Sequence, residues 1–195
     1  RLTRQDPFQC CISFIISANS NIPNIRSRLQ KLCRKFGTKT RIESKEFFVF
    51  PSPKSLGNAT LHDLQKCGLG YRSRYVLDTS RAVFSGEINF DELKKTNYQT
   101  ARESLLKLPG IGGKVADCIM LFSLEKLEAF PIDIWITKIL KKYYPNNFSM
   151  EKKTVSKKKY EKIHQQVLDH FGNFAGYSQQ FLFKMERDLN GKKWL

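Results

Sequence analysis

Apolar residues recur along most of the chain at the three- and four-residue spacing of helices. In the segment 22–36, for example, isoleucines, leucines and a phenylalanine share one face, with arginine and lysine between them. The same spacing, bounded by proline or glycine, predicts helices over 7–17, 22–36, 61–67, 72–84, 98–108, 115–122, 133–144, 158–171 and 175–189. The apolar segment 47–53 is broken by prolines and is predicted to be a packed loop. Because strand patterns are few, we predict an all-α fold.

The charge balance changes this picture by indicating a polyanionic partner. The 195 residues include 34 Lys and Arg against 18 Asp and Glu, a formal net charge of +16. Such an excess favours nucleic acid, although a generally lysine-rich composition would give the same count. The densest charge run, 151–162, has the composition of a solvated loop or helix face. No apolar run approaches the roughly 20 residues of a membrane span, so no membrane partner is expected.

The five cysteines, Cys10, Cys11, Cys33, Cys67 and Cys118, are scattered and mostly embedded in apolar helical patterns. This distribution predicts reduced thiols in an intracellular protein of the cytoplasm, nucleoid or nucleus. No C-x-x-C spacing occurs, so neither a zinc site nor an iron–sulfur cluster has a ligand set. We therefore expect no metal and no cofactor.

The string LPGIGGKVADCI at 108–119 predicts a helix–hairpin–helix. One helix would end at Leu108 and a second would begin near Gly113. Gly110 and Gly112 permit unusual backbone angles and remove side chains, so that N–H groups at the second helix can approach a phosphate. An ordinary helical corner would have the same outline. The whole string, in so basic a chain, favours DNA binding.

Two polar residues beside apolar segments are candidates for chemistry. Lys114 lies just inside the second helix, where the helix dipole disfavours a cation. Desolvation and the helix N-terminus both favour the neutral amine that a nucleophile requires, while the alternative is a second phosphate contact. Asp133 is a lone carboxylate in AFPIDIWI at 129–136, and buried acids are rare unless paired or catalytic. Its alternative is a helix N-cap after Pro131, and both readings can hold together.

These motifs resemble the 8-oxoguanine DNA glycosylase/AP lyase family of the HhH-GPD DNA glycosylase superfamily. The resemblance runs essentially end to end, through QDPF at 5–8, SFIISANSNI at 13–22, GLGYRSRYV at 68–76 and FGNFAGYSQQFLF at 171–183, besides LPGIGGKVADCI and FPIDIWI. It implies two helical subdomains with the helix–hairpin–helix at their junction. We expect one subdomain over 19–113 and the other over 1–18 plus 114–195.

The resemblance also implies a role for each matching residue at the reaction centre. Lys114 matches the Schiff-base nucleophile and Asp133 the catalytic aspartate. Phe183 would stack on the flipped purine, and Gln179 would bond its Watson–Crick edge. Cys118 matches a third residue of that base pocket. An aromatic face with a polar edge reader is what recognition of a flipped base requires.

Further matches imply contacts with the DNA duplex. Asn19 would fill the space left by the flipped base. Tyr71 and Arg72 match the pair that wedges the duplex and contacts the orphaned cytosine. The phosphate contacts would come from the glycines of the corner, Gly110, Gly112 and Gly113.

The chain departs from the family pattern in three places. It begins with Arg1, just before QDPF, so we expect it to lack the family's N-terminal β-rich domain, which recognises N7 of 8-oxoguanine. Asn24 stands where eukaryotic members have an arginine that reads cytosine, which implies relaxed opposite-base selectivity. Trp135 replaces a common histidine, which implies a lost or substituted phosphate contact.

The sequence therefore predicts a monomeric, bifunctional DNA glycosylase/AP lyase. It would flip and excise 8-oxoguanine from duplex DNA through a lysine Schiff base and then cleave the strand by β-elimination. The alternatives are a glycosylase for another damaged base and a non-catalytic helix–hairpin–helix DNA-binding module. The missing cluster cysteines argue against the endonuclease III branch, and Lys114 argues against monofunctional alkylbase enzymes.

Overall fold

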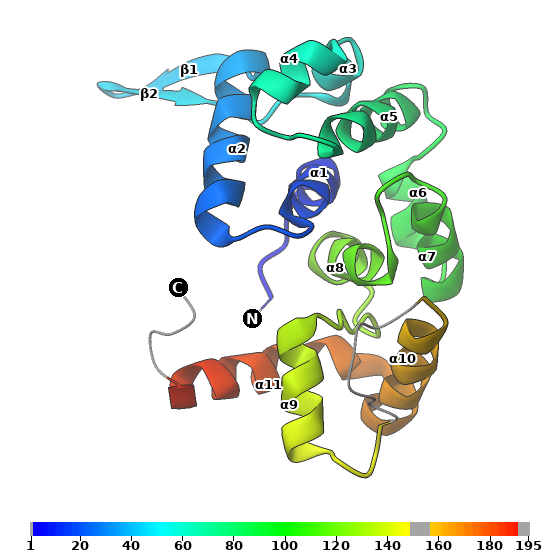
Figure 1. The fold of residues 1–195 in the computed structure, drawn as a ribbon. Coiled ribbons are helices and arrows are strands. Elements are labelled where there is room, and N and C mark those ends of the chain that lie inside the picture. Colours follow the sequence, from blue (N-terminus) through cyan, green and yellow to red (C-terminus); the bar gives the residue numbers. More distant parts are fainter. Residues whose placement is uncertain (1, 149–156, 191–195) are drawn as a thin grey trace. The chain divides into compact units, whose positions relative to one another are not determined.

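The computed structural model describes residues 2–148 and 157–190, and helices dominate them (Figure 1). The all-α prediction is confirmed. The helices are α1 (Pro7–Ser17), α2 (Ile22–Phe36), α3 (Pro53–Gly57), α4 (Leu61–Lys66), α5 (Arg72–Phe84), α6 (Phe90–Lys95), α7 (Tyr98–Leu106), α8 (Gly113–Ser123), α9 (Ile134–Tyr143), α10 (Lys157–Phe171) and α11 (Ala175–Asn190), with a 3-10 turn at Gly172–Phe174. Of the predicted charge run 151–162, residues 151–156 lie outside the described residues and the rest begins α10.

All nine predicted helices form, with ends within two residues of those expected. Local signals explain this agreement. The helix α1 begins with proline at its first position, and the side chain of Asp6 accepts the N–H of Gln9 at 2.8 Å. The helix α2 is capped in the same way by Asn21, which accepts the N–H of Asn24 at 3.0 Å. Chain-local caps of this kind can be read without knowledge of the tertiary structure.

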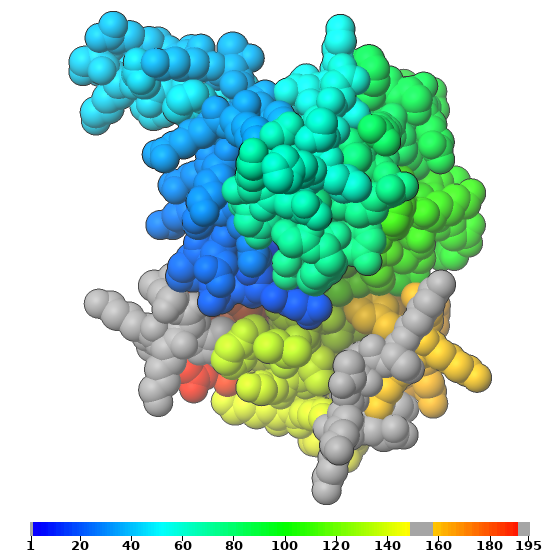
Figure 2. Space-filling model, turned by 45° about the horizontal axis from the view of Figure 1, so that its top comes forward, coloured from blue at the N-terminus to red at the C-terminus, as the bar shows by residue number. Residues whose placement is uncertain are grey.

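The prediction of a packed loop over 47–53 is wrong at both ends, because residues 47 and 48 end a strand and Pro53 begins α3. Two strands, β1 (Lys39–Ile42) and β2 (Lys45–Phe48), form an antiparallel hairpin in which Lys39 pairs with Phe48. The hairpin projects beyond α2 in the space-filling view (Figure 2). Its residues are almost all exposed, so the strands lack the alternation of apolar and polar positions that makes a strand readable. Two further short helices, α3 and α6, were also not predicted.

The chain divides into two compact units, each with its own core. The first comprises residues 5–93 and 107–110, and within it α1 packs against α2 and α5, and α3 against α5. The second comprises the described residues of 1–4, 94–106 and 111–195. These units group residues 5–18, 94–106 and 111–113 differently from the predicted subdomains 19–113 and 1–18 plus 114–195, which stay a prediction.

The second unit carries most of the candidate chemistry. Within it α9 and α11 pack together, as do α7 and α8 (Figure 1). Its core is built from buried side chains of α9, α10 and the segment before α9: Phe130, Ile132, Ile136, Ile139, Leu140, Ile163 and Val167. Among the residues that the structure describes, no helix is long and apolar enough to cross a membrane.

Candidate active site

The predicted helix–hairpin–helix forms from α7, a turn and α8. The turn is anchored by two buried side chains, Leu108 at 6% exposure and Ile111 at 6%. Between and beside them Pro109, Gly110 and Gly112 are exposed. The first N–H groups of a helix have no partner within the helix. The corner therefore presents the start of α8 to the surface with little side-chain cover.

The three glycines of this corner meet different surroundings. Gly110 has φ of +82°, and an added Cβ would lie 2.4 Å from the ring of Tyr75. A Cβ on Gly113 would lie 2.7 Å from the ring of Tyr160. Gly112 has an ordinary φ of −96°, and nothing lies within 4 Å of a Cβ built there. The fold thus requires glycine at 110 and 113, whereas Gly112 alone is free to serve the approach of a ligand.

Lys114 is the second residue of α8 and is half-buried. The six residues that follow it, from Val115 to Met120, are buried. Their burial fixes the helix that carries the amine. Lys114 and Asp133 lie in the same compact unit.

Asp133 is half-buried and caps α9, as the N-cap interpretation predicted. Its Oδ1 accepts the N–H groups of Trp135 at 2.9 Å and Ile136 at 2.8 Å. Within residues 2–148 and 157–190, its Oδ2 accepts no hydrogen bond. The carboxylate is therefore held in one direction by two backbone donors, while one oxygen stays available to stabilise a positive charge.

The residues of the predicted base pocket all lie in the second unit. Cys118 is buried in α8, at 3% exposure. Gln179 of α11 is buried; its Nε2 donates to the carbonyl of Pro131 at 3.3 Å, and its Oε1 accepts from Gln180 at 2.5 Å. Phe183 is half-buried and packs against the core of this unit. Gln179 thus touches the segment that leads to Asp133, and the pocket roles stay predictions.

Three of the predicted duplex-facing residues, Asn19, Tyr71 and Arg72, lie in the first unit. Asn19 is exposed, has φ of +48° and donates from Nδ2 to the Tyr71 hydroxyl at 3.5 Å. Tyr71 is 55% exposed, as a wedge between bases would have to be. Arg72 is only 5% exposed, and its guanidinium lies 4.4 Å from the Tyr71 ring centroid. A contact of Arg72 with the orphaned cytosine stays a prediction.

Two arginines hold the loops that carry Asn19 and Tyr71. The Arg72 guanidinium donates to the carbonyls of Ala18 at 3.0 Å and Asn19 at 3.3 Å. Arg28 donates from Nη1 to the Ser20 hydroxyl at 2.6 Å and from Nε to the carbonyl of Gly68, three residues before Tyr71, at 2.9 Å. Arg28 was not predicted as a site residue, because its spacing on α2 marks only a solvated face.

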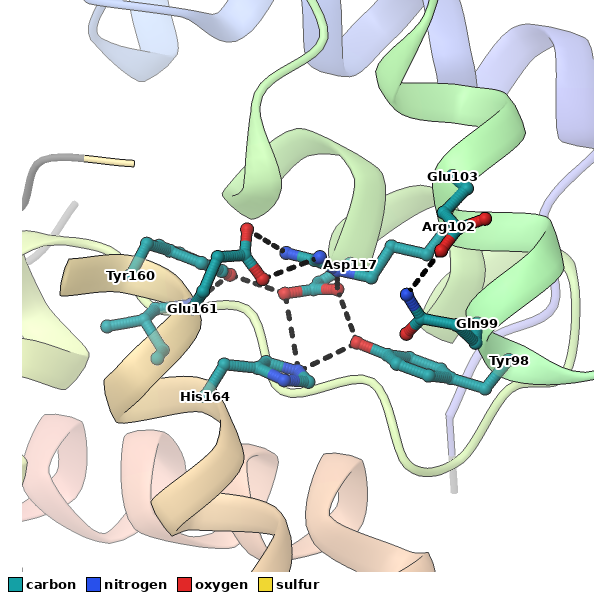
Figure 3. Close-up of polar contacts among 9 residues, drawn as sticks. Tyr98, Gln99, Arg102, Glu103, Asp117, Tyr160, Glu161 and His164 are labelled. Atoms are coloured by element: carbon teal, nitrogen blue, oxygen red, sulfur yellow. Dashed lines mark hydrogen bonds and ion pairs between the residues drawn. The ribbon is translucent and has the colours of Figure 1, made fainter. Parts of the chain in front are cut away.

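A buried polar network lies behind the start of α8 (Figure 3). At its centre is Asp117, with no exposed surface. Its Oδ1 accepts from Arg102 at 3.1 Å and from the Tyr98 hydroxyl at 3.0 Å. Its Oδ2 accepts from the Tyr160 hydroxyl at 2.5 Å and lies 3.5 Å from His164 Nε2. Arg102 also forms a two-pronged pair with Glu161, at 2.8 and 3.0 Å.

Burial governs the protonation states in this network. It raises the pKa of Asp117 to about 6, against the opposing effect of Arg102. Burial, followed by the charge of Arg102, lowers the pKa of His164 to about 4. Burial, and then the Asp117 carboxylate, raise the pKa of both tyrosine hydroxyls, Tyr98 and Tyr160, so both remain donors. At neutral pH an ionised Asp117 therefore faces a charged Arg102 and a neutral His164.

Comparison with known proteins decides the family. The sequence pattern of the HhH-GPD superfamily base excision DNA repair proteins matches residues 12–166. The chain belongs to the HhH-GPD superfamily. Its two-unit helical fold with the hairpin before α8 agrees with that membership, and the predicted resemblance is confirmed.

Several relatives of this HhH-GPD chain are named as N-glycosylase/DNA lyases. It is 32% identical to a probable N-glycosylase/DNA lyase of Methanothermobacter thermautotrophicus, over 94% of this chain and 62% of the relative. It is 33% identical to the N-glycosylase/DNA lyase OGG1 of Arabidopsis thaliana, over 95% of this chain and 52% of the relative. The chain thus spans between half and two thirds of the length of these relatives.

A solved structure resembles it closely. The 8-oxoguanine glycosylase/lyase of Clostridium acetobutylicum, in complex with duplex DNA containing cytosine opposite 8-oxoguanine, superposes with a TM-score of 0.87. It is 36% identical, and the match covers 98% of this chain and 63% of that one. This likeness extends the family assignment to the fold of nearly the whole chain.

Asp117, the centre of the polar network, was not predicted as a site residue, although its place in an apolar run could have indicated it. Asp117 stands in the apolar run VADCIMLF, just as Asp133 stands in AFPIDIWI. The criterion of a lone acid among apolar residues selects both, and the structure buries Asp117 more deeply than Asp133. The partners of Asp117 could not be read from the sequence, because they come from α7 and α10.

Proposed function

We propose that this HhH-GPD chain is a bifunctional DNA glycosylase/AP lyase that removes 8-oxoguanine from duplex DNA through a Schiff base on Lys114. One observation carries the proposal. Lys114 stands at the start of α8, directly behind an open glycine corner, in the same unit as a capped Asp133 with one oxygen available. The likeness to the 8-oxoguanine glycosylase/lyase of Clostridium acetobutylicum supports the choice of 8-oxoguanine as substrate.

The proposed reaction begins when backbone N–H groups at the corner bind a phosphate and so fix the sugar of the flipped nucleotide. The Lys114 amine then attacks C1′. A C–N bond forms as the bond from C1′ to the base breaks, and the base leaves with the electron pair. Asp133 stabilises the positive charge that develops on the sugar. The amine proton passes to the departing base, opening of the sugar ring gives the imine, and loss of a C2′ proton then expels the 3′ phosphate by β-elimination.

The partner in this proposal is a damaged DNA duplex, bound by a single copy of the chain. Lys114, Asp133 and the three predicted pocket residues all come from one unit of one chain, which supports action as a monomer. No metal-ligand cluster occurs among the described residues, and the proposed reaction is written with backbone N–H groups and side chains of this chain. A duplex substrate would place the protein in a compartment that holds DNA, the cytoplasm with its nucleoid or the nucleus.

A base-release assay tests the substrate. The chain in excess is incubated with duplexes of otherwise identical sequence. They carry 8-oxoguanine opposite cytosine, 3-methyladenine opposite thymine, or undamaged guanine opposite cytosine. Released base is measured by chromatography and strand scission by gel electrophoresis. The proposal requires release of 8-oxoguanine with scission of the same strand. Release of 3-methyladenine alone would favour a glycosylase for another base, and binding without any release would favour a DNA-binding module.

A further inference from the structure

We propose that Tyr160 is a positioning residue that joins the segment of Asp133 to the helix that carries Lys114. The inference rests on the proposed function, because it concerns the geometry of those two residues. Tyr160 lies on α10 and was not among the predicted site residues. It is 7% exposed and belongs to the core of the second unit.

One hydroxyl group makes the connection. The Tyr160 hydroxyl donates to Oδ2 of Asp117 at 2.5 Å, and it accepts the backbone N–H of Ile132 at 3.2 Å. Asp117 lies three residues after Lys114, on the next turn of α8, and Ile132 immediately precedes Asp133. A single oxygen atom thus links the helix of the proposed nucleophile to the segment that leads to the proposed carboxylate.

The ring of Tyr160 supports the same helix from a second side. A Cβ added to Gly113 would lie 2.7 Å from Cδ1 and from Cε1 of that ring. The ring therefore lies directly against the residue that precedes Lys114. Contacts with Gly113 and Asp117 bracket the proposed nucleophile on both sides along α8.

The other atoms of the network hold Tyr160 in place. Asp117 is fixed through its second oxygen by Arg102, which is 4% exposed. Arg102 is in turn paired with Glu161, the neighbour of Tyr160 on α10. Ion pairs between buried and half-buried groups of α7, α8 and α10 leave the Tyr160 hydroxyl little freedom. A group held in this way can set the distance between two reacting side chains, on which rates depend steeply.

The structure offers a matched pair of substitutions. Tyr160→Phe and Tyr98→Phe each remove one hydroxyl that donates to the Asp117 carboxylate, at 2.5 Å and 3.0 Å respectively. Of these two hydroxyls, only that of Tyr160 also accepts a hydrogen bond from the N–H of Ile132, the residue before Asp133. Tyr98 instead meets His164, with its oxygen 2.8 Å from Nε2. Both variants keep an aromatic ring, so both keep the packing.

The experiment measures Schiff-base formation under single turnover. The chain in excess reacts with an abasic-site duplex in the presence of borohydride, and the rate of covalent adduct formation is followed over a range of protein concentrations. We expect Tyr160→Phe to lower the rate at saturation about 10- to 100-fold without changing the half-saturating concentration. The rate of Tyr98→Phe at saturation should stay within about threefold of the unsubstituted rate, because this substitution leaves the bond between Tyr160 and Ile132 in place.

Melting temperatures of both variants separate positioning from stability. Equal rates at saturation in the two variants, or losses that follow the melting temperatures, would overturn the role of Tyr160 and leave the proposed function intact. Absence of any adduct with the unsubstituted chain would overturn the proposed function and the positioning role together. The proposed function and the positioning role are both supported if Tyr160→Phe is slow at an unchanged half-saturating concentration and Tyr98→Phe reacts at the unsubstituted rate.

Discussion

The three glycines at the corner between α7 and α8, Gly110, Gly112 and Gly113, have different structural roles, although they belong to one sequence motif. A methyl group on Gly113 would lie 2.7 Å from the ring of Tyr160 and 3.0 Å from Nη2 of Arg102. A methyl group on Gly112 would point into open space. Gly110 is unsuitable for testing phosphate binding, because an alanine there would be strained at φ of +82° and would clash with the ring of Tyr75, which would disturb the fold.

Alanine at these two positions should therefore separate folding from binding. We expect Gly113→Ala to lower stability by about 1–3 kcal/mol through overpacking. Gly112→Ala should cost about 1 kcal/mol or less, as a poorer N-cap, and should weaken duplex binding by covering the N–H groups of α8. Thermal melting and fluorescence anisotropy with a labelled duplex measure the two effects. Unchanged duplex affinity in a folded Gly112→Ala variant would contradict the phosphate contact.

His164 gives the second unit a dependence on pH. Its pKa is lowered from 6.5 to about 4, so its neutral form contributes stability that is complete above pH 6.5 and lost as the pH falls towards 4. The raised pKa of Asp117 acts with the opposite sign, contributing stability that is complete below pH 3.8 and lost as the pH rises through about 6.

Replacing His164 isolates its contribution from that of Asp117. The stability advantage of the unsubstituted chain over His164→Gln should shrink by up to about 3 kcal/mol between pH 6.5 and pH 4. Denaturant unfolding of both proteins at several pH values measures this difference. A difference that stays constant with pH would show that His164 titrates normally in the fold.

At the scale of elements, the start of α9 combines a structural and a proposed chemical task. Asp133 caps the helix through Oδ1 alone, and an asparagine carbonyl can accept the same two N–H groups. Asp133→Asn should therefore change stability by less than about 0.5 kcal/mol, while removal of the charge should slow base release about 100-fold. Asp133→Ala should additionally lose about 1 kcal/mol of stability.

Melting curves and single-turnover base release test this separation of tasks. If Asp133→Asn melts normally and releases base at the unsubstituted rate, the charge of Asp133 has no part in the reaction. If its melting temperature falls as far as that of Asp133→Ala, the cap depends on the charge as well as on the acceptor.

Helices could be predicted where their own residues carry the signal. Amphipathic spacing, caps and terminal prolines mark α1 and α2 without reference to the rest of the fold. The helix α3 has only five residues, too few for a periodic pattern, although Ser52 caps it. The hairpin of β1 and β2 escaped prediction because nearly all of its residues are exposed. The helix α3 packs against α5, a tertiary contact that the sequence does not display.

At the scale of the whole molecule, the same limit applies to the candidate site. Lys114 and the corner before it occupy one continuous string, so they could be predicted together. The network around Asp117 could not, because Tyr98, Asp117 and Tyr160 come from three helices and lie 19 and 43 residues apart in sequence. The buried position of Arg72 likewise depends on carbonyls of a loop more than 50 residues away.

The net charge of +16 leads to a prediction for the molecule as a whole. Binding to undamaged duplex should weaken steeply with salt, because each phosphate contact releases condensed counterions. Six phosphate contacts, for example, would give a slope of about −5 in log affinity against log salt concentration. Anisotropy titrations on duplexes of different sequence measure the slope. A slope near zero, or one that differs strongly between sequences, would contradict binding through phosphates.

The proposed identity of the nucleophile is tested most directly by borohydride trapping with Lys114→Gln. The substitution keeps the glycine corner and the buried face of α8, so the variant should fold and bind an abasic-site duplex nearly as well as the unsubstituted chain. The unsubstituted chain should give a covalent protein–DNA adduct, and Lys114→Gln should give none. Adduct formation by Lys114→Gln at the unsubstituted rate would mean that another amine attacks the sugar, and would contradict the account.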